Sequence, residues 1–133
     1  MAFYRTREGA LTAADSFTAL TSLYGQSTTG SIQVPSGSTQ IIGVIASVAM
    51  DSATNGASTF AIQLSGDGLS SGQETMTVAS AGVDGTPASN GNVDLPFTTA
   101  VAIPVVGSNQ VSVAAAMDTD IGTAAVSVTL VFA

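Results

Sequence analysis

The sequence has no histidine, cysteine, lysine or tryptophan, and its only two cationic side chains, Arg5 and Arg7, lie within the first seven residues. Histidine and cysteine supply most nucleophile–base pairs and most zinc, copper and haem ligands. Lysine supplies Schiff bases and the cation of phosphate-binding loops. Without them, the many serines have no conventional general base. We therefore expect a protein that is not an enzyme and that holds no cofactor or metal.

Charge is scarce as well as one-sided. Charged residues make up 8% of the chain, against about 25% in an average soluble domain. From Glu8 to Ala133 there are only carboxylates, and the formal net charge is −7. Because phosphate binding needs clustered lysine and arginine, direct binding of nucleic acid is not expected. A free monomer usually keeps a charged surface, so a surface of Ser, Thr, Ala and Gly favours packing against copies of itself.

From Gly30 onward, apolar and polar residues alternate in short runs that are separated by segments rich in Gly, Asn, Asp and Ser. This period of two is typical of strands. Pro96 and Pro104 cannot donate to a ladder, so residues 92–106 are interpreted as two short strands. A last strand with one strongly apolar face is expected at the centre of its sheet, since an exposed edge there would aggregate. The expected strands are 31–34, 39–50, 59–64, 73–79, two within 92–106, 110–117 and 124–132.

This strand pattern predicts an all-β protein. We expect an eight-stranded antiparallel jelly-roll sandwich over residues 28–133, preceded by an N-terminal arm over residues 1–27. An immunoglobulin-like sandwich is the alternative, although that fold usually buries a tryptophan or a cysteine pair, which this chain lacks. The strand number and the two long loops, 65–72 and 81–91, favour the jelly roll.

The predicted arm carries apolar residues three positions apart between Leu11 and Leu23. That spacing fits a short amphipathic helix over residues 11–24, or an extended arm whose apolar residues dock on a neighbour or on the domain's own sheet. Its two arginines are expected to meet the carboxylates of a neighbouring copy, with anionic lipid or a genome as less favoured partners. The residues expected to act in assembly are Arg5, Arg7, Phe17, Leu20, Leu23 and Tyr24.

Asp118 and Asp120 are the two carboxylates closest in sequence, and in a loop they could share a calcium ion with backbone carbonyls. Asp51, Asp67 and Asp84 lie in further candidate loops. None of these segments has the spacing of an EF-hand. Asp residues in turns commonly bond the local backbone, and we favour that role for each of them.

Three runs carry a resemblance to a known class of proteins: Ser31 to Ile45, Ile62 to Leu69, and Val111 to Phe132. They resemble small single-jelly-roll capsid proteins of icosahedral viruses, in particular the tailless viruses of bacteria and archaea. The resemblance lies in strand order, in strands rich in Ser, Thr, Gly and Ala, and in the preceding arm. It implies self-assembly into a shell, location in the virion, contacts with copies of itself and other capsid proteins, and possible contact with an inner membrane.

The chain departs from that class by its small size and by the lack of a basic arm. A major, a minor and a decoration role in the capsid therefore all stay open. One alternative is an extracellular filament subunit that is assembled by strand exchange, with the segment before Gly30 as the donor strand. A second alternative is a carbohydrate- or calcium-binding β-sandwich module.

Overall fold

The computed structural model describes residues 2–12, 16–23, 26–27, 30–51, 56–83, 93–118 and 123–133. Within these ranges the chain forms strands and no helix. None of the described residues belongs to a helix with the length and hydropathy of a membrane span. The strands are β1 (Phe3–Leu11), β2 (Thr18–Ala19), β3 (Ser22–Leu23), β4 (Gln26–Ser27), β5 (Ile32–Gln33), β6 (Gln40–Asp51), β7 (Gly56–Ser65), β8 (Gln73–Val83), β9 (Val93–Pro104), β10 (Gln110–Met117) and β11 (Thr123–Phe132).

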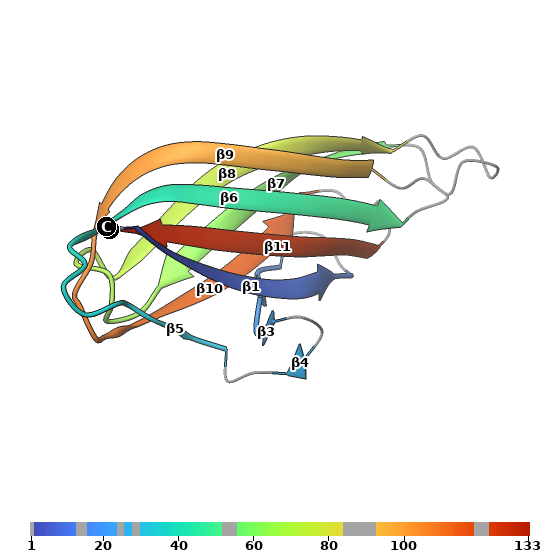
Figure 1. The fold of residues 1–133 in the computed structure, drawn as a ribbon. Coiled ribbons are helices and arrows are strands. Elements are labelled where there is room, and N and C mark those ends of the chain that lie inside the picture. The colour runs from blue at the N-terminus through green and yellow to red at the C-terminus, as the bar shows by residue number, and fades with distance from the viewer. Residues whose placement is uncertain are drawn as a thin grey trace.

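The strands form two antiparallel sheets that lie one over the other (Figure 1). The first sheet has the order β4-β3-β1-β11-β6-β9, and the second has the order β2-β10-β7-β8. Strand β5 also pairs with β10, next to β2 along the same strand. The predicted all-β sandwich is therefore confirmed. The last strand, β11, lies between β1 and β6, so its predicted central position is confirmed as well.

The core lies between the two sheets and follows the period of two that the sequence shows. In β11 every second residue is buried, from Ala124 to Phe132. In β10 the same alternation buries Val111, Val113, Ala115 and Met117. Because successive side chains of a strand point to opposite faces, each strand presents one apolar face to the other sheet. These residues belong to one continuous hydrophobic cluster with the buried side chains of β6 and β7.

Strand β6 changes its buried face partway along. Ile41 is buried, and so are Val44, Ala46 and Val48, which lie on the alternate parity. The register with β9 shifts between Ile41 and Gly43, and such a bulge moves the alternation by one residue. The sequence signal of this shift is the pair of consecutive apolar residues at 41 and 42. Residue 41 belongs to the odd-numbered positions, and residue 42 begins the even-numbered positions that are buried further along β6.

Strand β9 corrects one prediction. The interpretation of residues 92–106 as two short strands is wrong, because β9 runs without a break from Val93 to Pro104. Its ladder partner among the described strands is β6, so β9 is the last strand of its sheet. An edge strand has one side without ladder bonds, and a proline there loses no sheet hydrogen bond. This position explains how Pro96, opposite Ser47, fits into a continuous strand.

The N-terminal region corrects a second prediction, because it is not a separate arm. Strand β1 pairs with β11 along its whole length, from Phe3 opposite Phe132 to Leu11 opposite Ala124. The sandwich therefore begins at β1 and not at residue 28. The described residues 16–23 form β2 and β3, so the predicted helix is wrong there. Serine and threonine bond locally to the backbone and disfavour a helix interior, which is consistent with this result.

The extended alternative for this region, with apolar residues docked on the domain's own sheet, is the one that the structure shows. Leu11 and Leu20 are both 1% exposed and belong to the core cluster. The backbone N–H of Leu20 donates to the carbonyl of Val113 at 2.9 Å, which fixes this segment to β10. The N-terminal residues thus complete the sandwich on the side away from β9.

Candidate functional site

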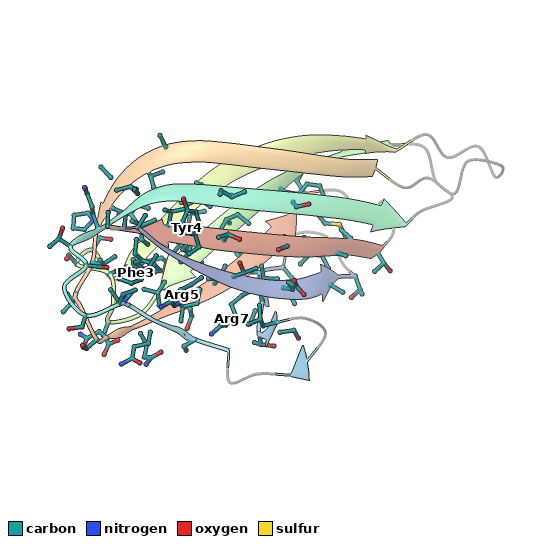
Figure 2. All side chains as sticks on the ribbon, viewed as in Figure 1. Phe3, Tyr4, Arg5 and Arg7 are labelled. Atoms are coloured by element: carbon teal, nitrogen blue, oxygen red, sulfur yellow. The ribbon has the colours of Figure 1, made fainter. Side chains whose placement is uncertain are left out.

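The two arginines lie on the face of β1 that turns toward the second sheet (Figure 2). Arg5 is opposite Leu130 and Arg7 is opposite Val128 in the β1–β11 ladder, and both partners are buried core residues. Residues opposite each other in a ladder share a face of the sheet. Tyr4, which precedes Arg5, points outward and is 61% exposed. Both cations therefore occupy core-facing positions of β1, at the margin of the sandwich.

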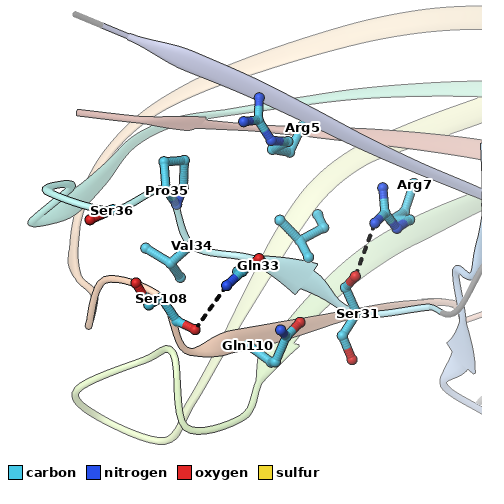
Figure 3. Close-up of a pocket in the computed structure, with 10 residues that line it drawn as sticks. Arg5, Arg7, Ser31, Gln33, Val34, Pro35, Ser36, Ser108 and Gln110 are labelled. Carbon is cyan, nitrogen blue, oxygen red and sulfur yellow. Dashed lines mark hydrogen bonds between the residues drawn. The ribbon is translucent and has the colours of Figure 1, made fainter.

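A groove of about 520 Å³ lies between this part of β1 and the segment that contains β5 (Figure 3). We call it the seam groove. Two apolar side chains, Ile32 and Val34, and the ring of Pro35 form part of its wall. None of the described residues that line it is a carboxylate. Its polar lining consists of Arg5, Arg7, Ser31, Gln33, Ser36, Ser108 and Gln110.

Arg7 joins the two walls of the seam groove. Its guanidinium donates to the carbonyls of Gly30 at 3.1 Å and Ser31 at 2.9 Å, just before β5. A further bond, of 2.7 Å, goes to the carbonyl of Thr6 on its own strand. Bonds from three nitrogens in one plane hold the guanidinium in a single orientation. Arg7 is therefore mainly a structural side chain, which fixes the approach of the chain to β5.

Arg5 differs from Arg7 in its contacts. It is exposed, and its guanidinium donates to the carbonyl of Tyr4 at 3.0 Å. The guanidinium carbon lies 5.7 Å from the centroid of the Phe3 ring, within the range of a cation–π contact. Phe3 itself packs against the core, so it offers a fixed support. Arg5 keeps most of its N–H donors available at the rim of the seam groove.

This difference leads to a test of stability. Replacing Arg7 with methionine keeps an unbranched apolar stem but removes the donors to Gly30 and Ser31. We expect the free energy of unfolding to fall by about 2 kcal/mol, since these bonds are charge-assisted and partly buried. Arg5→Met is the matched control and should cost less than about 0.5 kcal/mol, because Arg5 is exposed. Urea unfolding measures both variants, and equal losses would contradict the structural role of Arg7.

Of the other residues predicted to act in assembly, none of those that the structure describes lines the seam groove. Phe17 is 44% exposed and borders a second hollow, of about 350 Å³, together with Thr59, Ala61 and Met117. Leu20 is a core residue, and Leu23 is half-buried in β3. Tyr24 lies outside the described residues. The structure therefore places Arg5 and Arg7 together at the seam groove, whereas Phe17 borders the second hollow and Leu20 lies in the core.

Two loop carboxylates bond the backbone. The carboxylate of Asp67 accepts from the N–H of Gln110 at 3.0 Å, and that of Asp118 accepts from the N–H of Thr59 at 2.9 Å. The sequence favoured bonds to the local backbone, whereas both of these contacts reach a strand that is distant in sequence. Asp84 and Asp120 lie outside the described residues. Within the described ranges, no three His, Cys, Asp or Glu side chains are grouped so that they could hold a metal ion.

The comparisons with known proteins give no family for this chain. No protein-family model matches it, and no curated protein matches it. Among solved structures, it is similar to a chain in the crystal structure of dimeric latent PorU from Porphyromonas gingivalis, with 11% sequence identity and a TM-score of 0.45. That similarity covers 98% of this chain and 13% of the PorU chain. A likeness of this size carries no inference about function.

Proposed function

We propose that this chain is a structural protein that self-assembles into a viral capsid shell, as a capsid, minor capsid or decoration protein. The observation that carries the proposal is the strand order of the two sheets, β1-β11-β6-β9 and β2-β10-β7-β8. If β2 and β5 are counted together as one strand between β1 and β6, and the two-residue strands β3 and β4 are set aside, consecutive strands alternate between the sheets except at the β7–β8 hairpin. The first strand also pairs with the last. This winding supports a jelly roll, in which β2 and β5 together take the place of one strand beside β10.

The outward face of the first sheet supports assembly in a second way. On β1 and β11 this face carries Tyr4 and Glu8 among mostly short side chains, and the hydroxyls of Thr6 and Thr129 form a hydrogen bond of 2.7 Å there. Ala10 and Ala125 lie opposite each other on the same face. When another copy packs against neutral, short side chains, little side-chain conformational entropy is lost and the desolvation free energy is small. Such a face suits repeated contacts between copies. The proposal places the protein in the virion and gives it other capsid proteins as further partners.

The filament alternative needs the segment before Gly30 to leave its own sheet and enter that of a neighbour. In the structure β1 is paired with β11 over nine residues, and Leu11 and Leu20 are buried in the same chain. Releasing them would expose core residues and break a complete ladder. These contacts favour a shell subunit over a subunit joined by strand exchange.

The proposal is tested by the size and shape of what the purified chain forms. Light scattering behind size-exclusion chromatography should detect assemblies of many copies, and electron microscopy should show closed shells or shell fragments. Urea at a concentration below the unfolding transition should return the assemblies to folded monomers, because weak neutral contacts separate before the core opens. A folded monomer at every concentration, or open fibres, would refute the shell.

A further inference from the structure

The seam groove brings together the two cations of a chain whose remaining charged groups are carboxylates. The formal net charge is −7, and among the described residues that line the groove none carries a negative charge. The rest of the polar lining is hydroxyls and amides, which donate hydrogen bonds readily to oxygen. A concave site with two guanidiniums and no carboxylate is complementary to a carboxylate ligand.

We propose that the seam groove binds an extended acidic segment of a second copy of this chain, with the Arg5 guanidinium as the cation that contacts it. This inference rests on the proposed function, since it supplies one of the contacts between copies. Charge complementarity identifies the occupant: a second copy carries nine carboxylates in its sequence and, beyond residue 7, no cation that would repel Arg5.

The spacing of the arginines sets the shape of the ligand. Arg5 and Arg7 are two residues apart on one face of β1, so their Cα atoms are roughly 7 Å apart. Two carboxylates that are also two residues apart in an extended segment have the same spacing. Residues 118–120 have the sequence Asp-Thr-Asp, which is the one place where this chain carries two carboxylates at that spacing. A peptide with that sequence is therefore a suitable probe.

The two arginines contribute differently to binding. Arg7 is held by the carbonyls of Thr6, Gly30 and Ser31, so it shapes the groove and adds its charge. Arg5 has one such bond, to the carbonyl of Tyr4. Because the carbonyls of Tyr4 and Thr6 already accept from these side chains, the ligand is not expected to add to β1 as a further strand. Binding instead takes place through side chains, with Gln33, Ser36 and Gln110 on the opposite wall.

The experiment uses the full chain and a fluorescent peptide, Gly-Thr-Asp-Thr-Asp-Thr-Gly with blocked ends. Fluorescence anisotropy should show saturable binding to the native chain. Arg5→Glu should weaken it by at least about tenfold, the effect of losing one charge-assisted hydrogen bond. Arg5→Lys, which keeps the charge but not the planar fork, should fall between the two. A peptide with Asn in place of Asp is the matched control and should not bind.

The same reagents test whether the occupant is a second copy. The acidic peptide should inhibit self-association of the native chain, and Arg5→Glu should raise the concentration needed for assembly by at least about tenfold. Thermal melting of each variant checks that it is folded. No saturable peptide binding, equal binding by Arg5→Glu, or tighter binding of an oligonucleotide would overturn the acidic-segment site.

Two results separate this inference from the proposed function. If shells form, and neither the peptide nor Arg5→Glu changes assembly, the second copy is not the occupant of the groove, while the capsid function stands. If the native chain binds the peptide but never self-associates, the capsid function is refuted. The identification of a second copy as the occupant of the seam groove is then refuted as well. Peptide binding and assembly are measured independently, so each result is assigned to one of the two ideas.

Discussion

Replacing Gly66 with alanine is expected to lower the free energy of unfolding by about 3 kcal/mol or more. Gly66 has a φ of 115°, which residues with a Cβ rarely adopt. A Cβ added there would lie 2.6 Å from the carbonyl oxygen of Gln110, a backbone atom that cannot move aside without breaking β10. The same carbonyl accepts from the N–H of Gly68 at 2.8 Å, so the loop and the strand are tied at this point.

Gly72 provides the matched control in the same loop. Its φ is 81°, also in the left-handed region, but an added Cβ would meet no heavy atom within 4 Å. Gly72→Ala should therefore cost only the conformational penalty, about 1–2 kcal/mol. Chemical unfolding of both variants, followed by circular dichroism, separates the steric contribution from the conformational one. Equal losses for the two variants would show that the loop does not pack against Gln110 as described.

This loop shows where prediction from the sequence stops. The glycines and serines of residues 65–72 predicted a turn-rich loop, and one is present. Glycine is used both where a chain must turn and where another backbone comes close, and the sequence does not separate these uses. Gly66 serves both purposes, whereas Gly72 serves the first. The contact with Gln110 depends on which strand lies beside the loop, and local sequence does not specify that.

The N-terminal region illustrates the same limit for periodicity. Strand alternation after Gly30 predicted most of the long strands, and in β7, β10 and β11 alternate residues are buried. Between Leu11 and Leu23 the spacing of three suggested a helix, but the described residues 16–23 include the short strands β2 and β3. Among the described residues of this segment, Leu11 at the end of β1 and Leu20 between β2 and β3 are buried in the core. A coincidence of spacing in a short, threonine-rich segment cannot be told from a helical face by pattern alone.

The candidate site could be predicted only in part. That Arg5 and Arg7 share a face follows from their spacing once residues 3–11 are known to be a strand. The opposite wall of the seam groove comes from residues 31–36 and 108–110, which are far away in sequence. Serine and glutamine in those segments carry no motif, so nothing local marks them as neighbours of the arginines. The groove becomes visible only when the two sheets are placed together.

Replacing Phe132 with alanine is expected to cost about 3–5 kcal/mol, although it is the second-last residue of the chain. Its side chain is 0% exposed, and it lies opposite both Phe3 and Ile41 in the first sheet. Chain ends usually fray unless hydrogen bonds hold them. Here the carbonyl of Ala133 accepts from the N–H of Thr39 at 2.8 Å, and the N–H of Ala133 donates to the carbonyl of Gln40 at 2.9 Å.

Phe17→Ala is the control of the same residue type. Phe17 is 44% exposed and borders a surface hollow, so its truncation should cost less than about 1 kcal/mol. Urea unfolding of the monomeric chain gives both values, and comparable losses would mean that the C-terminal end is not fixed in the core. A large loss at Phe132 alone would show that β11 is held to its last residue. The two sheet neighbours on either side of it, β1 and β6, would then depend on it for their packing.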